Sequence, residues 1–313
     1  MTYLEKALRI KYIRLHFTVV FLENTNLPPY KVSALRGGMG EMLLRANCIR
    51  DRNCKKCEFE PECIVHKTFY TKSAVRPEYV TAQDSTGYIL ECENDTEDFC
   101  EGDLLQFDLL LFGKSIAYFH QYIEAFWALG KEGIGKNNAR FQIVSVTDTR
   151  KNRFLEGDFR KQPRHPIYTL GEYAAYRVRQ FQKNGCKNRL IFQMPVTLKY
   201  QGEFRDTFLM EAVWEAVLRR IYMLECYEGI ECSIYDSIGA DDIQMPVIEE
   251  QVCKDMYVTR YSSSQNRKMT LWGISGYAQL DDIPQQMLLI LAAGELTHIG
   301  KNTSFGFGKY RIV

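Results

Sequence analysis

The chain of 313 residues is long enough for two domains of ordinary size, and its 46% hydrophobic and 25% charged residues are typical of a globular protein. No apolar run reaches the roughly 20 residues of a transmembrane helix, and the first residues lack the charged and then apolar layout of a secretion signal. A net charge of +1 argues against a protein that coats nucleic acid indiscriminately. We therefore expect a cytoplasmic protein that has no membrane partner.

The charge is unevenly distributed along the chain. Residues 150–189 hold eleven Lys or Arg and three acids, whereas residues 225–255 hold nine acids and one Lys. Such blocks predict separate positive and negative surfaces, of which the positive one would attract phosphates. Solvated loops have the same composition, so this pattern alone leaves both interpretations open.

Two segments of the chain predict the same order of elements. In the first, alternating apolar and polar residues at 11–23 predict a strand, and Ser33 is expected to cap a helix that ends at Asn47. Strands at 86–93 and 103–112, a helix at 115–129 that stops at Gly130, and a strand at 139–147 follow. The second segment predicts strands at 188–200, 256–260, 268–280 and 308–313, with helices at 207–227 and 283–294.

A short repeat supports two copies of one domain. Ile134-Gly135-Lys136-Asn137 recurs as Ile299-Gly300-Lys301-Asn302, in both cases between the last predicted helix and the last predicted strand. The order strand, helix, strand, strand, helix, strand is that of a ferredoxin-like domain. We therefore expect an α+β protein with tandem ferredoxin-like domains at residues 1–149 and 188–313, joined by a basic linker at 150–187.

The glycine-rich segment 300–310 is the strongest chemical signal. Glycines let the backbone approach a ligand and present N–H groups to phosphate oxygens. Lys301 and Lys309 add positive charge, and three aromatic residues are candidates for stacking on bases, namely Phe305, Phe307 and Tyr310. The glycine spacing excludes a P-loop. A tight turn before a closing strand is the alternative interpretation.

The C-terminal stretch resembles the signature of the CRISPR repeat-processing endoribonucleases of the RAMP (repeat-associated mysterious protein) superfamily. Its matching features are Arg260-Tyr261-Ser262 with Gln265, Gly273, Gly276, Gly294-Glu295-Leu296, His298, Gly300-Lys301 and Gly306-Phe307-Gly308-Lys309-Tyr310. In the first half, Leu35-Arg36-Gly37 with Gly40 and a following cysteine cluster is similar to one branch of that family. The resemblance covers both ends of the chain, whereas residues 94–255 are supported by element order alone.

The resemblance implies a tandem ferredoxin-like protein that binds the repeat of a precursor CRISPR RNA. It also implies cleavage without a catalytic metal, leaving a 5′-hydroxyl and a 2′,3′-cyclic phosphate. Such cleavage needs proton transfer at two oxygens and a cation near the charged phosphorane. The residues expected to bind RNA are Arg36, Arg260, Arg267, Lys268, Gly300, Lys301, Asn302, Ser304, Gly306, Gly308 and Lys309.

His298 is the predicted proton-transfer residue, because it lies between the last helix and the glycine-rich segment; helix capping is the alternative. Tyr30 and Lys301 are expected to support the reaction. Many relatives carry the catalytic histidine on the first helix, but residues 33–47 contain none. The remaining histidines are expected to be packing residues (His16 and His120), a neighbour or ligand of the cysteine cluster (His66) and an exposed RNA contact (His165).

Four cysteines, Cys48, Cys54, Cys57 and Cys63, have the spacing of a four-thiolate metal site. Basic residues between them are expected to lower the pKa of the thiols. We predict a structural zinc ion in an insertion at 48–66, with an iron–sulfur cluster as the alternative. A closed four-thiolate site has no open coordination position, so no catalytic metal is predicted.

Two main function hypotheses follow from these observations. The first is a metal-independent endoribonuclease for CRISPR repeats. The second is a non-catalytic RNA-binding RAMP subunit of a CRISPR effector complex. Effector subunits, a reverse transcriptase or an integrase are the protein partners that the resemblance implies. A third hypothesis treats the cysteine cluster as the centre of an unrelated redox or zinc protein.

Overall fold

A computed structural model describes residues 8–52, 54, 57–70, 87–148, 167–230, 233–238, 243–262 and 267–313. The described chain divides into two compact units. The N-terminal unit comprises residues 12–52, 54, 57–70, 87–148, 167, 261–262 and 267; the C-terminal unit comprises residues 8–11, 168–230, 233–238, 243–260 and 268–313. None of the described helices is both long and apolar enough to cross a membrane.

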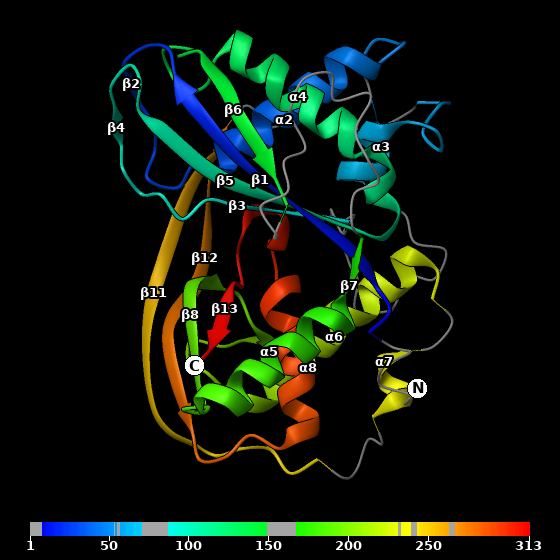
Figure 1. The fold of residues 1–313 in the computed structure, drawn as a ribbon, viewed down its shortest axis with the longest axis vertical. Coiled ribbons are helices and arrows are strands. Elements are labelled where there is room, and N and C mark those ends of the chain that lie inside the picture. Colours follow the sequence, from blue (N-terminus) through cyan, green and yellow to red (C-terminus); the bar gives the residue numbers. More distant parts are fainter. Residues whose placement is uncertain are drawn as a thin grey trace. The chain divides into compact units, whose positions relative to one another are not determined.

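The N-terminal unit contains an antiparallel sheet in the order β3-β5-β1-β6 (Figure 1). Its strands are β1 (Lys11–Phe21), β3 (Tyr88–Glu91), β5 (Leu104–Phe112) and β6 (Phe141–Thr147); β2 (Thr25–Asn26) and β4 (Asp98–Phe99) form a small separate pair. Its helices are α2 (Val32–Asn47), α3 (Ile64–Phe69) and α4 (Phe119–Glu132), with a 3-10 turn, η2 (Gly113–Tyr118). The alternation in β1 buries Leu15, Phe17 and Val19 in a core shared with α2 and α4.

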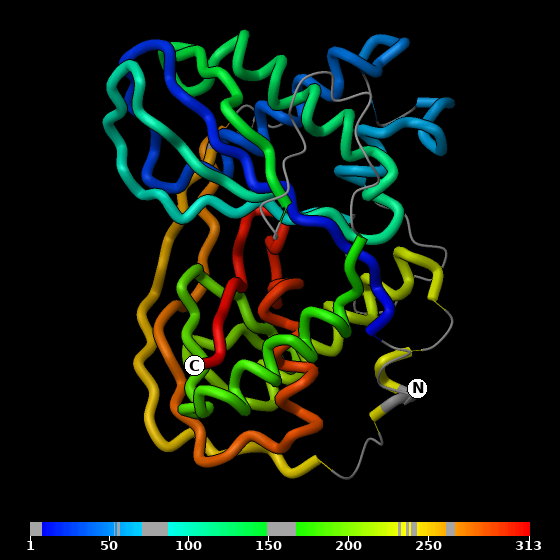
Figure 2. Tube along the Cα trace, viewed as in Figure 1, coloured from blue at the N-terminus to red at the C-terminus, as the bar shows by residue number. Residues whose placement is uncertain are grey.

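The C-terminal unit repeats this arrangement with a sheet in the order β11-β12-β8-β13. Its strands are β8 (Arg189–Val196), β11 (Ile248–Ser262), β12 (Arg267–Leu280) and β13 (Tyr310–Ile312), and a small hairpin consists of β9 (Lys199–Tyr200) and β10 (Glu203–Phe204). The helices are α5 (Leu170–Asn184), α6 (Met210–Glu228), α7 (Ile234–Ser237) and α8 (Gln285–Thr297). Figure 2 shows the last strand, in red, beside the green β8, far from it in sequence.

The structure differs from the predicted elements at several places. Strand β11 begins at Ile248, eight residues before the predicted strand at 256–260, and α3 and the strand pairs β2–β4 and β9–β10 were not predicted. Residues 168–187, predicted as linker, contain the two-residue strand β7 (Tyr168–Thr169) and helix α5, which begins with a capping box between Thr169 and Glu172. Helix α4 continues past Gly130 to Glu132, and Gly133 is its C-cap. Gly130 instead allows the close approach of β6, because a Cβ there would lie 2.4 Å from the Phe141 carbonyl oxygen. Helix α2 begins after Lys31, so Ser33 is inside the helix rather than its cap.

The short sequence repeat has a common structural basis. In each unit it follows the second helix of the ferredoxin-like motif, α4 or α8, and precedes the closing strand. Ile134 and Ile299 are buried, and Gly135 and Gly300 have φ values of 81° and 75°. An L-residue is disfavoured in this left-handed region, so both turns require glycine for the same reason.

Candidate functional site

The glycine-rich loop connects α8 to β13 in the C-terminal unit and is tied to the end of β8. The Lys301 amide donates to the Thr197 carbonyl at 3.3 Å, and the Gly308 amide donates to the Pro195 carbonyl at 2.8 Å. Gly308 has a φ of 74°, and a Cβ there would lie 1.8 Å from the Ile299 carbonyl oxygen. The loop therefore depends on glycine for its own packing.

Much of the loop that was predicted to touch RNA is buried. Ser304, Gly306 and Gly308 are covered, and the amides of both glycines bond to protein carbonyls. The three aromatic residues predicted to stack on bases are also buried, namely Phe305, Phe307 and Tyr310. This contradicts the predicted stacking role, because these rings fill the core of the C-terminal unit.

The exposed part of the loop is its first turn. Gly300 and Lys301 are exposed, while Asn302 and Lys309 are half-buried. Lys301 is therefore the loop cation best placed to meet a phosphate, since its ammonium group is not held in the core.

The other predicted RNA-binding cations lie apart from this turn in the chain. Arg267 and Lys268 are exposed at the start of β12. Arg260 is half-buried, and its guanidinium lies 4.6 Å from the centre of the Phe305 ring. Arg36 lies on α2 of the N-terminal unit, 5.0 Å from the centre of the Phe69 ring. The structure therefore distributes these cations over both units.

His298 follows the last residue of α8 and is completely buried. Its φ is 54°, and its Nδ1 lies 3.1 Å from the carbonyl oxygen of Phe307. The imidazole thus joins the two ends of the glycine-rich loop. Burial argues against direct proton transfer to RNA by His298, so the predicted catalytic role stays a prediction, and a positioning role fits the geometry better.

Tyr30, the second predicted catalytic residue, precedes α2 in the N-terminal unit. Burial raises the pKa of its phenol far above the ordinary value, and the nearby Cys92 thiol acts in the same direction. The phenol therefore keeps its proton at neutral pH and cannot act as a base there.

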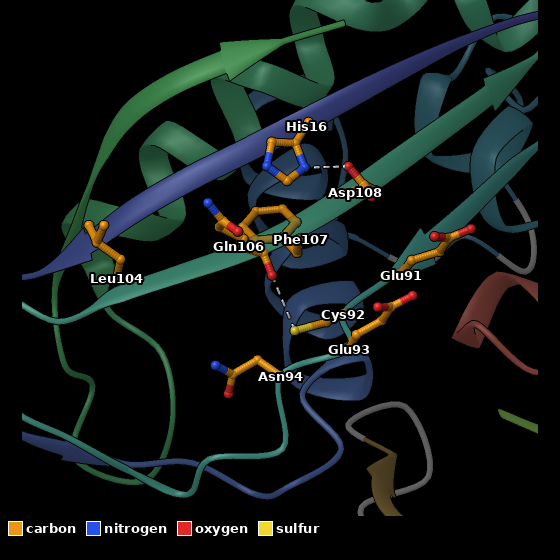
Figure 3. A pocket seen from close by; sticks show the side chains of 9 residues that line it. All are labelled: His16, Glu91, Cys92, Glu93, Asn94, Leu104, Gln106, Phe107 and Asp108. Atoms are coloured by element: carbon orange, nitrogen blue, oxygen red, sulfur yellow. Dashed lines mark hydrogen bonds and ion pairs between the residues drawn. The ribbon is translucent and has the colours of Figure 1, made fainter. Parts of the chain in front are cut away.

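Among the described histidines, His16 differs from the packing residue that its strand position predicted. Its side chain is 37% exposed on the face of β1 opposite the core, and its Nδ1 lies 2.7 Å from Oδ1 of Asp108 on β5 (Figure 3). The hydrogen bond to Asp108 raises the pKa of His16, while partial burial opposes it. An imidazole oriented by a carboxylate and open to solvent has the features of a proton-transfer group.

His16 and Asp108 lie at a cavity of about 410 Å³. The cavity is lined by His16, Glu91, Cys92, Glu93, Asn94, Leu104, Gln106, Phe107 and Asp108 (Figure 3). Glu91 is paired with Arg14, which reduces the negative charge. Burial raises the pKa of the Cys92 thiol, so this group is a neutral thiol rather than a thiolate nucleophile.

The other histidines have ordinary explanations or fall outside the described residues. The centre of the His120 ring lies 3.8 Å from the centre of the Phe119 ring. His66 is buried, and its Nε2 lies 3.4 Å from a carboxylate oxygen of Glu60. His165, the predicted RNA contact in the linker, lies outside the part of the chain that the structure describes.

The four cysteines of the predicted metal site line one small cavity of about 20 Å³. Cys48 follows the last residue of α2, Cys63 precedes the first residue of α3, and Cys54 and Cys57 lie between the two helices. His66 and Glu60 reach the same cavity. The fold thus brings these donors together although Cys48 and Cys63 are 15 positions apart in the sequence.

This arrangement has the donor chemistry of a zinc site but not its finished geometry. Within the described residues, no three His, Cys, Asp or Glu side chains form a group that could hold a metal ion as they stand. Burial, and then the neighbouring thiols, raise the pKa of Cys54, in contrast to the lowering expected from nearby basic residues. The Cys54 thiol therefore favours its neutral form unless a cation stabilises the thiolate.

Comparison with known proteins agrees with the fold. A family described as CRISPR-associated endoribonuclease Cas6 matches residues 190–310, and a second family model, described as an N-terminal domain, matches residues 8–180. An uncharacterized protein of Archaeoglobus fulgidus is 20% identical over 300 residues, which cover 94% of this chain and 95% of that protein.

Solved structures share the whole fold at low sequence identity. A partial Cas6-RT-Cas1–Cas2 complex matches with a TM-score of 0.58 and 13% identity, covering 97% of this chain and 46% of that chain. This chain thus spans about half the length of that protein. A Cas6 product complex matches with a TM-score of 0.50 and 12% identity, covering 96% and 100%. These matches confirm the predicted α+β fold with tandem ferredoxin-like units.

The C-terminal unit with its glycine-rich loop thus matches the family described as CRISPR-associated endoribonuclease Cas6. Solved Cas6 structures share the fold of the whole chain.

Proposed function

We propose that this chain binds CRISPR repeat RNA and cuts it within the repeat. The observation that carries the proposal is the Cas6 family match over residues 190–310, which includes the glycine-rich loop and its exposed Lys301. Relatives of known structure include a Cas6 bound to its product. The loop supplies a cation beside a fixed turn, which suits a phosphodiester.

The proposed reaction is attack by the 2′-hydroxyl beside the cut on the adjacent phosphorus. The 2′-oxygen loses its proton, the 5′-oxygen gains one as the P–O5′ bond breaks, and the products are a 2′,3′-cyclic phosphate and a 5′-hydroxyl. Both proton transfers can be performed by side chains, and a lysine can stabilise the phosphorane. The reaction is therefore expected to proceed without a catalytic metal.

Two histidines compete for the proton-transfer role. The sequence places His298 beside the loop, but its ring is buried. His16 is partly exposed, oriented by Asp108 and has a raised pKa, so its protonated form is a candidate acid for the 5′-oxygen. We assign proton transfer to His16 and a positioning role to His298. Glu93 argues against the assignment to His16, because a negative charge at the same cavity repels the phosphates of RNA.

A cleavage assay tests the function. Repeat RNA from the same genome, incubated with the protein in excess EDTA, is expected to yield one discrete cut, with a cyclic phosphate on the 5′ fragment. A repeat with a single 2′-deoxy sugar at the cut is expected to bind with unchanged affinity and to resist cleavage, since the internal nucleophile is absent. Cleavage of the 2′-deoxy repeat would contradict this mechanism.

The alternative is a non-catalytic RNA-binding subunit of a CRISPR effector complex. The burial of His298 and the lack of histidine in α2 favour it. Tight repeat binding with no cleavage under any of these conditions would establish it. In either case we propose repeat RNA as the main partner, and effector subunits, a reverse transcriptase or an integrase as protein partners, because a structural relative is part of a Cas6-RT-Cas1–Cas2 complex.

We also propose that Cys48, Cys54, Cys57 and Cys63 hold a structural zinc ion. The support is the convergence of four thiols on one cavity between α2 and α3. The ion would stabilise the thiolates and join the two helices, a contribution to folding and not to RNA cleavage.

A further inference from the structure

Phe204 is an exposed aromatic ring on a short hairpin of the C-terminal unit. It belongs to β10, is 53% exposed, and lies opposite Lys199 in the β9–β10 pair. The connecting residues Gln201 and Gly202 have φ values of 50° and 85°, as a type I′ turn requires. This turn type matches the twist of the strands, so it holds the ring in a defined position.

The hairpin separates two kinds of side chain between its faces. Successive residues of a strand point to opposite faces, so Phe204 shares one face with Lys199, while Tyr200 and Glu203 share the other. Arg205 lies with the second group, 5.6 Å from the Tyr200 ring centre and 3.9 Å from a Glu203 carboxylate oxygen. The face that carries Phe204 therefore has basic and aromatic character, and the nearest hairpin acid is on the other side.

Lys301 of the glycine-rich loop reaches the same ring. Its Nζ lies 4.6 Å from the centre of the Phe204 ring, and the Nζ of Lys199 lies 6.0 Å from it. The half-buried Trp272 of β12 meets the ring edge-on, with 6.4 Å between ring centres. We call Phe204, Lys199, Lys301 and Trp272 the Phe204 patch.

The backbone fixes the parts of the patch relative to one another. The Thr197 carbonyl accepts the Lys301 amide, and the Thr197 hydroxyl donates to the Trp272 carbonyl. The next carbonyl, that of Leu198, accepts the Arg205 amide and closes the hairpin. The end of β8 thus joins hairpin, glycine-rich loop and β12, so the patch is preorganised.

We propose that the Phe204 patch stacks an unpaired base of RNA, with Lys199 and Lys301 contacting the adjacent phosphates. This inference rests on the proposed binding of repeat RNA and adds the subsite and the single-stranded state of the nucleotide. An exposed aromatic ring with two ammonium groups within 6.0 Å of its centre matches the chemistry of a nucleotide, which joins an aromatic base to anionic phosphates. An acidic protein segment would use the cations but would leave the ring without a stacking partner.

The test measures the affinity of purified variants for repeat RNA. Phe204→Ala is expected to weaken binding about tenfold, because one stacked base is lost. Phe204→Tyr is expected to bind within about twofold of the wild type, since it retains a ring. The matched control is Tyr176→Ala on α5, an aromatic residue 52% exposed in the same unit, which is expected to change nothing. Melting temperatures of all variants check that the hairpin folds.

Two further measurements identify what the ring contacts. The first measurement places a single abasic nucleotide at each position of the repeat in turn. At one position it is expected to weaken binding by the wild type but not by Phe204→Ala, because the variant has already lost the stacking contact. The second measurement is the slope of log affinity against log salt concentration. Lys199→Ala and Lys301→Ala are each expected to reduce this slope by the equivalent of about one phosphate contact.

The outcomes separate this inference from the proposed function. If the wild type does not bind repeat RNA, the proposed function is wrong. If the wild type binds and Phe204→Ala binds equally well, the patch inference alone is wrong. The patch inference is also wrong if an abasic nucleotide changes the affinity of the wild type and of Phe204→Ala by the same factor at every position. Unchanged RNA binding together with loss of a copurifying protein from Phe204→Ala would make the patch a protein-docking surface instead.

Discussion

Arg177 and Glu295 form a two-point ion pair that joins α5 to α8 in the C-terminal unit. Nε of Arg177 lies 2.6 Å from Oε2 of Glu295, and a second guanidinium nitrogen lies 3.0 Å from Oε1. The Glu295 carboxylate also accepts the Ile312 amide of β13 at 2.6 Å. The buried carboxylate of Glu295 therefore connects three elements: α5, which lies in the predicted linker, α8, which precedes the glycine-rich loop, and the closing strand β13.

Removal of this carboxylate is expected to destabilise the protein strongly. Glu295→Ala leaves the Arg177 guanidinium without its carboxylate and the Ile312 amide without its acceptor, and we expect a loss of about 3–5 kcal/mol in the free energy of unfolding. The control is Glu215→Ala, which breaks the exposed pair with Arg219 on α6 and is expected to cost less than about 1 kcal/mol. Urea denaturation measures both, and equal losses would contradict the role of the buried pair.

A side chain at Gly308 is expected to disrupt the glycine-rich loop. A Cβ there would meet the Ile299 carbonyl at 1.8 Å, whereas one at Gly185 would have no neighbour within 4 Å. Both residues have positive φ, 74° and 80°, so Gly185→Ala controls for the backbone penalty of about 1–2 kcal/mol. Gly308→Ala is expected to cost clearly more and to weaken repeat binding. Similar stabilities and affinities for the two variants would show that the loop tolerates the side chain.

The His16–Asp108 pair predicts a pH-dependent stability. The folded pKa of His16 is raised, so its contribution is fully present below the unfolded value of about 6.5 and is lost as pH rises through the folded pKa. Relative to His16→Gln, the wild type is expected to be more stable at pH 5.5 than at pH 8.5, by less than about 1 kcal/mol because the pair is partly exposed. Asp108→Asn is expected to remove this difference. A stability difference that grows with pH would contradict the assignment.

The roles of the two histidines are expected to separate in cleavage assays. His16→Gln is expected to lower the cleavage rate about a hundredfold and to leave repeat affinity within a few-fold, because proton transfer is lost. His298→Ala is expected to lower the melting temperature and repeat affinity together, because the loop loses its Nδ1 contact with Phe307. The opposite result, a rate loss in His298→Ala with normal stability and none in His16→Gln, would restore proton transfer to His298.

The cysteine cluster is expected to contain about one zinc ion per chain. Protein purified without added metal, analysed by elemental analysis, tests this. The double variant with Cys54→Ser and Cys57→Ser is expected to lose the metal and to melt at a lower temperature, since structural zinc is coupled to folding. Cys100→Ser, a change at an exposed cysteine that does not line this cavity, is the control and is expected to keep both. Bound iron in place of zinc would indicate an iron–sulfur cluster instead.

The sequence by itself determined the element order of the two ferredoxin-like motifs and the likeness of the two units. Residues 11–21 alternate because one face of β1 packs on helices, and the repeats at Ile134 and Ile299 occupy the same turn in both units. These features are local, since side-chain periodicity and glycine at positive φ report directly on the backbone. The spacing of the four cysteines likewise predicted that they gather, whereas helix α3, which follows them, was not predicted.

Only the tertiary structure decided which side chains are open to a ligand. His298 is adjacent to the loop in sequence, yet the loop folds back over its ring. His16 is within a strand, yet it is partly exposed, because it shares a strand face with Arg14 and not with Leu15. Phe204 and Lys301 are 97 residues apart and meet only because β8 joins the hairpin to the loop. Exposure depends on what distant segments cover, and local pattern carries no information about those segments.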